Sequence, residues 1–134
     1  MADERKRTMN MADYDAMVNA YAECAIWSSS DYDDLDNPET AAPMDRHHST
    51  DDLDVTAWQS FRADCEAFAE ANASDLANMD AEQAGHDFWL TRNHHGTGFW
   101  DRGLGVIGHR LNNAANAYGE CDLYVGDDGR VYVS

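Results

Sequence analysis

The spacing of apolar residues along the chain predicts three main helices. In residues 11–27 the apolar positions recur every three or four residues, which is typical of one face of an amphipathic helix. A second helix is expected over residues 56–77, where Thr56 and Gln59 have the spacing of a capping box. A third is expected over residues 105–118, with Gly119 as its C-terminal cap.

Two further stretches predict β-hairpins. Residues 88–92 alternate and are rich in strand-forming side chains, and residues 98–100 return as their partner after a turn at residues 93–96. Residues 123–125 and 130–133 flank Gly-Asp-Asp-Gly, which is a strong hairpin signal. Asp80 and Gln83 repeat the capping signature and predict one short helical turn before the first hairpin.

Together these elements predict an α+β fold in which about three main helices pack on a small antiparallel sheet of two hairpins. The 134 residues are expected to form a single domain. Residues 1–10 are polar and are expected to fray. Residues 31–55 contain nine acidic residues and one basic residue, Arg46, and are expected to form a long acidic loop.

The chain is strongly acidic: it contains 26 acidic and nine basic residues, which gives a net charge of −17. Residues 1–80 hold 19 acids and five bases, whereas residues 81–134 hold seven acids and four bases. Such a chain is not expected to bind nucleic acid directly, since carboxylates and phosphates repel each other. The same field attracts basic protein surfaces.

High-salt adaptation is an alternative explanation of this acidity. Asp outnumbers Glu by 19 to seven, and Lys6 is the only lysine. In that case the carboxylates would solvate the protein rather than recognise a partner.

The cysteines, Cys24, Cys65 and Cys121, are odd in number and lie far apart, without a Cys-x-x-Cys pair. They are therefore expected to be reduced and buried in a cytoplasmic protein. The sequence shows neither the pattern of a signal peptide nor an apolar run long enough to span a membrane. No contact with a membrane is expected.

Residues 85–102 carry most of the candidate chemistry, with two Phe-Trp pairs, three His, two Arg and two Asp. Five residues would converge near the predicted hairpin and are candidates for ligand binding: Arg92, Asn93, His95, Trp100 and Asp101. Pairing of Arg with Asp across the strands is the ordinary explanation of the same residues. The spacing of the histidines argues against a dedicated metal site. No cofactor is expected. No nucleophile and base have a recognisable spacing, so no catalytic residue is assigned and an enzyme is not favoured.

At residues 85–102 the chain resembles a family of small proteins encoded by phages and prophages. The resemblance extends to residues 23–29 and to residues 117–132, and so covers much of the chain. The run His-Asp-Phe-Trp-Leu-Thr-Arg-Asn is its most specific part, while His94 beside His95 departs from a pattern with a single His. The resemblance implies a phage protein in the host cytoplasm and supplies no activity.

These observations favour an acidic phage accessory protein that binds a host or viral protein with a basic surface. One form of this hypothesis is a DNA mimic that inhibits a nucleic-acid-binding host defence factor. Its partner-binding residues would be the carboxylates of the acidic loop: Asp31, Asp33, Asp34, Asp36, Asp51, Asp52 and Asp54. The alternatives are a small enzyme or ligand-binding domain using residues 86–102, and a homo-oligomeric structural protein that associates through exposed aromatic side chains.

Overall fold

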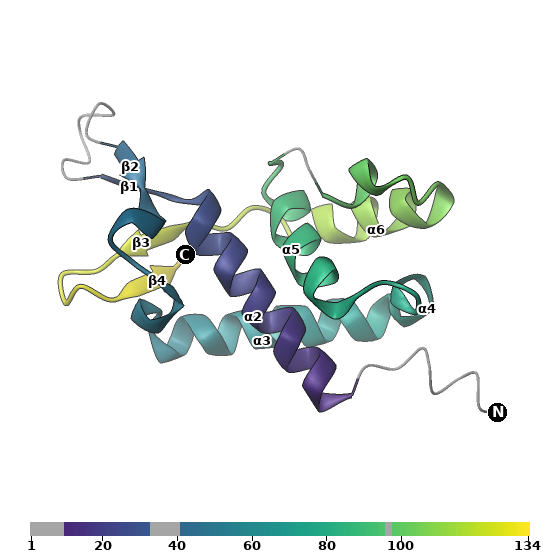
Figure 1. Cartoon of the computed structure of the whole chain (residues 1–134), viewed down its shortest axis with the longest axis horizontal. Helices are drawn as coiled ribbons and strands as arrows, with labels where there is room; N and C mark the ends of the chain where they lie inside the picture. The colour runs from purple at the N-terminus through teal and green to yellow at the C-terminus, as the bar shows by residue number, and fades with distance from the viewer. Residues whose placement is uncertain (1–9, 33–40, 96–97) are drawn as a thin grey trace.

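The computed structural model describes residues 10–32, 41–95 and 98–134, and the fold is α+β as predicted (Figure 1). The elements, in chain order, are α2 (Met11–Ser28), β1 (Ser30–Tyr32), β2 (Ala41–Pro43), the 3-10 helices η2 (Met44–Arg46) and η3 (Thr50–Asp52), α3 (Val55–Ala71), α4 (Ala73–Leu76), α5 (Ala81–Arg92), the 3-10 helix η4 (Phe99–Arg102), α6 (Val106–Asn116), β3 (Leu123–Val125) and β4 (Val131–Val133). The predicted fraying of residues 1–10 falls almost entirely outside the described residues.

Side chains at the helix starts explain where α2 and α3 begin. Asn10 and Asp13 form a reciprocal capping box at the start of α2. The predicted box of Thr56 and Gln59 is wrong, because α3 begins one residue earlier and Asp54 caps it. The Asp54 carboxylate accepts the backbone N–H of Thr56 at 2.9 Å. A carboxylate at this position also interacts favourably with the helix dipole.

The hairpin predicted over residues 88–100 is wrong. Asp80 caps α5 through the backbone N–H of Gln83, as its signature indicated, but the helix then continues to Arg92. Eight of its residues are buried, since α2, α6 and η4 all pack against it. A helix buried around most of its circumference has no polar face. The short pattern of residues 88–92 therefore matched a strand as well as a helix.

The described strands form two separate antiparallel pairs instead of one sheet. The hairpin of β3 and β4 is confirmed, with Leu123 opposite Val133. The second hairpin, β1 with β2, lies in the segment predicted as a loop over residues 31–55, which also contains η2 and η3. An isolated bridge from Leu53 to Val131 joins this segment to β4, and the Asp54 N–H donates to the Val131 carbonyl at 2.8 Å.

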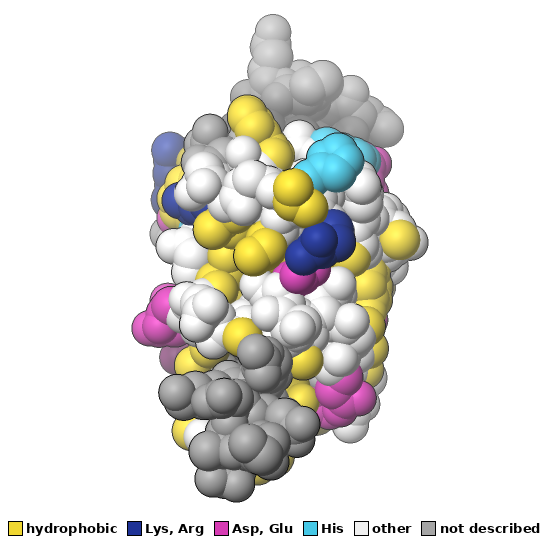
Figure 2. Space-filling view, turned by 90° about the vertical axis from the view of Figure 1, so that its right-hand side faces the viewer, with side chains coloured by type: hydrophobic (Ala, Val, Ile, Leu, Met, Phe, Trp, Pro, Cys, Tyr) yellow, Lys and Arg dark blue, Asp and Glu magenta, His cyan; other side chains and the backbone are white. Residues whose placement is uncertain are grey.

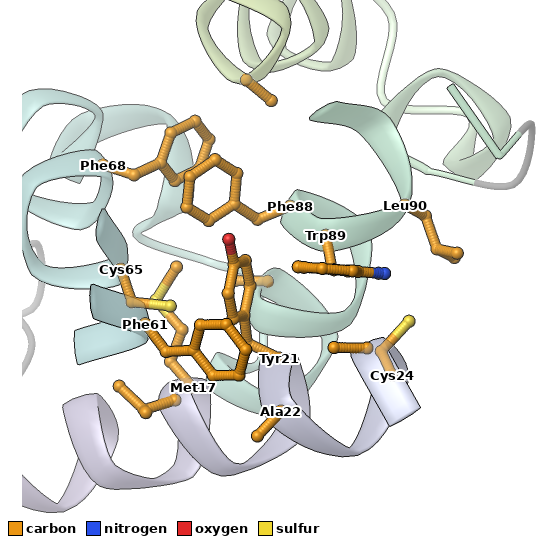
Figure 3. Close-up of a cluster of buried hydrophobic side chains, with 14 of the residues drawn as sticks. Met17, Tyr21, Ala22, Cys24, Phe61, Cys65, Phe68, Phe88, Trp89 and Leu90 are labelled. Carbon is orange, nitrogen blue, oxygen red and sulfur yellow. The ribbon is translucent and has the colours of Figure 1, made fainter. Parts of the chain in front are cut away.

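Aromatic side chains from α2, α3 and α5 fill the centre of the core (Figure 3). Phe68 stacks on Phe88 with 4.2 Å between ring centroids. The Tyr21 ring meets Phe61 and Trp89 edge-on at 5.1 and 5.3 Å. Both arrangements suit the quadrupoles of aromatic rings, so these contacts fix how the three helices pack.

The molecule has two distinct ends on either side of this core. Both hairpins lie at one end, while α4 and α6 lie at the other (Figure 1). We call the first the acidic end and define it as residues 41–54 together with residues 122–133.

Among the described residues, no helix is long and apolar enough to cross a membrane.

Candidate functional site

The glycines of residues 85–102, which we call the central run, allow close packing. A Cβ atom on Gly85 would lie 2.1 Å from the carbonyl oxygen of Met17, so only glycine lets α5 approach α2 this closely. A Cβ on Gly98 would lie 1.9 Å from the Thr91 hydroxyl. That hydroxyl accepts the backbone N–H of Phe99 at 3.2 Å and so attaches η4 to α5.

A fully buried carboxylate, Asp87, forms the second link between α5 and η4. Arg102 binds it through Nη2 at 2.8 Å and through Nε at 3.1 and 3.2 Å to its two oxygens. The Gln83 side-chain amide donates a further bond at 2.8 Å. These bonds compensate the cost of removing the carboxylate from water. The Asp87–Arg102 pair therefore links α5 to η4.

Arg92, also in the central run, is buried and binds four groups from other parts of the chain. Its guanidinium donates to the Tyr21 hydroxyl at 3.0 Å and to the Asp64 carboxylate at 2.8 Å. It also donates to the backbone carbonyls of Tyr118 and Gly119 at 3.1 and 2.8 Å. Each nitrogen of the guanidinium thus has a partner, and α2, α3 and the segment after α6 meet at this side chain.

The three segments that carry the family resemblance contact one another in the structure. The Trp89 indole N–H donates to the Ser28 hydroxyl at 2.8 Å. The Asn93 side chain donates to the Trp89 carbonyl at 3.0 Å, which caps α5, and accepts the backbone N–H of Cys121 at 2.8 Å. These three segments are therefore joined to one another by hydrogen bonds.

The structure places the described members of the predicted ligand-binding set in different surroundings. Arg92 and Asn93 use their polar atoms in the internal bonds described above. His95 and Trp100 are exposed at the surface. The side chain of Asp101 lies outside the described residues. Among the described residues, no three His, Cys, Asp or Glu side chains are placed to hold a metal ion.

The predicted partner-binding carboxylates differ in availability. Asp33, Asp34, Asp36 and the side chain of Asp31 lie outside the described residues. Asp51 is exposed. Asp52 accepts the Ser49 backbone N–H at 3.0 Å, and Asp54 caps α3 and pairs with Arg130 at 3.1 Å. Asp52 and Asp54 therefore have local structural roles, and the predicted role in binding rests on Asp51 among the fully described members.

Every arginine from Arg62 onward is bound to a carboxylate of the same chain. The pairs are Arg62 with Asp15 and Glu66, Arg92 with Asp64, Arg102 with Asp87, Arg110 with Asp75, and Arg130 with Asp54. These contacts neutralise the positive charges locally. The exposed carboxylates beyond these pairs, together with the exposed Arg46 at the acidic end, then contribute to the field around the molecule.

The exposed carboxylates of the acidic end come from both halves of the sequence, while others, such as Glu23, Glu70 and Glu82, are exposed elsewhere on the molecule. Asp45 and Asp51 come from the segment before α3, and Asp122 and Asp127 come from the C-terminal hairpin. The bridge from Leu53 to Val131 joins these two segments. The structure thus combines an N-terminal and a C-terminal group of acids that lie far apart in the sequence.

An open hollow of about 330 Å³ lies between α2 and α5. Its lining includes Glu23, Glu82, His86 and Arg102, and the buried Asp87 holds Arg102 in place. The hollow is broad and mixed in charge. It offers no pairing of a nucleophile with a base.

The cysteines are poorly suited to covalent chemistry. Burial, together with the nearby charge of Asp87, raises the pKa of Cys24 to about 12. Burial also raises the pKa of Cys65 and of the half-buried Cys121. Because the thiolate is the reactive form, all three remain protonated and weakly nucleophilic at neutral pH.

Sequence reasoning missed the partners that organise the central run. Asp64, Tyr21 and Ser28 lie on other helices, so no local spacing connects them to Arg92 or Trp89. One local signal was present, because Gln83 and Asp87 stand four residues apart, as hydrogen-bonded side chains on one helix do.

Comparison of the chain with protein-family models, with curated proteins and with solved structures finds no match.

Proposed function

We propose that the protein acts by binding another protein with a basic surface through its acidic end. The observation that carries this proposal is the division of charge. The arginines from Arg62 onward are bound internally, whereas the acidic end exposes the carboxylates of Asp45, Asp51, Asp122 and Asp127 against one exposed arginine, Arg46. Such a surface accelerates encounter with a basic partner and selects against acidic ones.

The partner in this proposal is a host or viral protein, and the favoured class is a nucleic-acid-binding host defence factor in the host cytoplasm. A groove that accepts the phosphates of nucleic acid presents Lys and Arg side chains, and a surface of carboxylates occupies it by charge complementarity. The phage context comes from the family resemblance alone. An inhibitor of this kind needs no catalytic residue.

The structure gives less support to a small-molecule site in the central run, because Arg92 and Asn93 are engaged internally. High-salt solvation remains the competing explanation of the acidity. The two explanations differ in whether the position of a carboxylate matters, and this difference can be measured.

The test begins with a pull-down from host lysate at moderate salt, followed by affinity measurements on the purified complex. The double variant Asp45→Asn/Asp51→Asn removes two charges from the acidic end. The matched control, Glu70→Gln/Glu82→Gln, removes two exposed charges on α3 and α5. We expect the first variant to weaken binding on the order of tenfold and the control to change it little, because close charge pairs dominate such contacts.

Equal effects of the two double variants would contradict the proposal and favour solvation by net charge. Retained binding in both variants would place the contact elsewhere. Unchanged thermal unfolding of each variant shows that the fold is intact, which is expected because none of the four residues is buried.

A further inference from the structure

We propose that a pair of tyrosines at the acidic end binds arginine side chains of the basic partner. Tyr124 and Tyr132 stand directly opposite each other on β3 and β4. Their rings stack with 5.6 Å between centroids and 21° between planes, and we call the two rings the tyrosine platform. This inference rests on the proposed function, because it names the chemical group that the acidic end recognises.

The tyrosine platform lies on the outer face of the C-terminal hairpin. Successive side chains of a strand point to opposite faces, so Tyr124 points away from the core that buries Leu123 and Val131. Tyr124 is 51% exposed, and among the described residues Tyr132 is the only aromatic ring in contact with it. One face of the Tyr124 ring is therefore open to a partner.

Contacts made by Tyr132 hold the platform in place. Its hydroxyl donates to the Asp128 carboxylate at 2.5 Å, and this bond raises the pKa of Tyr132 to about 12. Its ring lies against the turn of the hairpin, since a Cβ atom on Gly126 would come within 2.6 Å of the ring carbon Cε1. Rings that are positioned before binding lose little conformational entropy when a partner arrives.

A neighbouring carboxylate, Asp122, selects a cation as the occupant of the platform. Asp122 continues the pairing of β3 with β4, because its carbonyl oxygen accepts the backbone N–H of Ser134 at 2.9 Å. Its exposed side chain stands two residues before Tyr124 and so projects from the same face of the hairpin. A cation stacked on the Tyr124 ring thus has a carboxylate on the same face, and both groups attract it.

The two arginines of the acidic end leave this attraction in place. Arg130 donates from Nε to Asp54 at 3.1 Å and from Nη2 to the Leu53 carbonyl at 3.2 Å. Arg46 is exposed on η2, in the other segment of the acidic end. Against these two arginines the acidic end holds seven Asp residues, so its net charge stays negative at pH 7.

The shape of the guanidinium group favours arginine over lysine on this platform. A guanidinium is planar and weakly hydrated, so it stacks on an aromatic face while its N–H groups bind a carboxylate. The ammonium group of lysine is compact and strongly hydrated, and gains less from the ring. The structure therefore predicts a preference for arginine that net charge alone does not produce.

The opposite end of the molecule supplies a control for this preference. In the view of that end, hydrophobic side chains gather in the upper half, and the Asp and Glu side chains in view lie mostly toward the edges (Figure 2). Trp100 belongs to η4, which packs against α6, and is 60% exposed. Because Trp100 lies outside the acidic end, Trp100→Leu removes an exposed ring without touching the platform.

Calorimetric titration of the purified full chain with oligo-arginine and oligo-lysine peptides of equal length tests the platform at about 150 mM salt. We expect the wild type to bind oligo-arginine about three- to tenfold more tightly than oligo-lysine. Tyr124→Leu should reduce this preference below about twofold, because leucine keeps apolar bulk but has no ring face. Tyr124→Phe and Trp100→Leu should both retain the preference. Comparing Leu with Phe at one exposed position keeps the test independent of a small loss of hairpin stability.

A wild type without a preference for arginine, or a preference that survives Tyr124→Leu, would overturn the tyrosine platform. An equal loss in Trp100→Leu would also overturn it, since any exposed ring would then suffice. The double variant Asp45→Asn/Asp51→Asn separates this result from the proposed function. If it weakens both peptides while Tyr124→Leu changes nothing, the acidic end remains the binding surface and only the platform fails. If it changes nothing while Tyr124→Leu removes the preference, the platform stands and the wider acidic surface fails.

Discussion

The central run and the acidic end use the same kinds of side chains in opposite surroundings. In the central run, Asp87 and Arg92 are buried, and each is held by several internal bonds. At the acidic end, Asp45, Asp51 and Asp127 are exposed. The comparison shows that a dense mixture of polar and aromatic residues can serve packing alone. In our proposal, the exposure of polar side chains, more than their density, indicates the binding surface.

The sharpest test of this comparison is to remove Arg92. Arg92→Ala should lower the free energy of unfolding by about 3–5 kcal/mol, because it leaves partly or fully buried partners without their donor. Arg110→Ala, which breaks a solvent-exposed pair with Asp75, should cost much less. Urea titration of both variants measures the difference. Equal, small losses would mean that Arg92 is dispensable for folding and available for function.

Gly85→Ala should have the next largest effect. The added methyl group meets the Met17 carbonyl, a backbone atom that cannot rotate away, and should cost about 1–3 kcal/mol by separating α5 from α2. Thermal unfolding measures the loss. A variant as stable as the wild type would contradict the close crossing of the two helices.

A smaller effect is expected from the bond between Trp89 and Ser28. Trp89→Phe removes the indole N–H as well as part of the ring, and Ser28→Ala removes only its acceptor. The bond itself should contribute about 0.5–1.5 kcal/mol. A double-mutant cycle on the free energy of unfolding isolates this contribution. Strict additivity of the two substitutions would show that the two segments are not coupled.

The smallest effect concerns the surface pair of Asp75 with Arg110. The hydrogen bonds from Arg110 lower the pKa of Asp75 below its ordinary value of 3.8. A lowered pKa in the folded state stabilises the protein above the unfolded value, and this stabilisation is lost as the pH falls through the folded value. The wild type should therefore be more stable than Asp75→Asn near pH 7, and the difference should disappear in acid. A difference independent of pH would contradict this account.

The helices with one polar face could be predicted from sequence, and α5 could not. Residues 105–118 show a clear helical period, and α6 buries one face through Gly108, Leu111 and Ala115. The hairpin at residues 123–133 has an unambiguous Gly-Asp-Asp-Gly turn. In α5 the period is hidden because the neighbouring elements bury most of the helix. The turn residues that follow it, including His94 in the left-handed region, end a helix instead of joining two strands.

The candidate site could be predicted only in part, because its decisive features are contacts between distant residues. The charge of the chain indicated a basic protein partner, and that inference still rests on charge. The sequence did not show that Arg130 would neutralise Asp54, 76 residues away. Nor did it show that Asp122 and Asp127 would join the acids that precede α3. Pairing and exposure are properties of the folded chain.

The salt dependence of the complex captured through the acidic end tests the central claim most directly. Its dissociation constant should be measured by calorimetry from about 50 to about 500 mM salt, a range over which the screening length falls from above 10 Å toward 3 Å. We predict that affinity falls on the order of tenfold or more across this range, because exposed carboxylates supply the attraction. An affinity that does not change with salt would contradict the account.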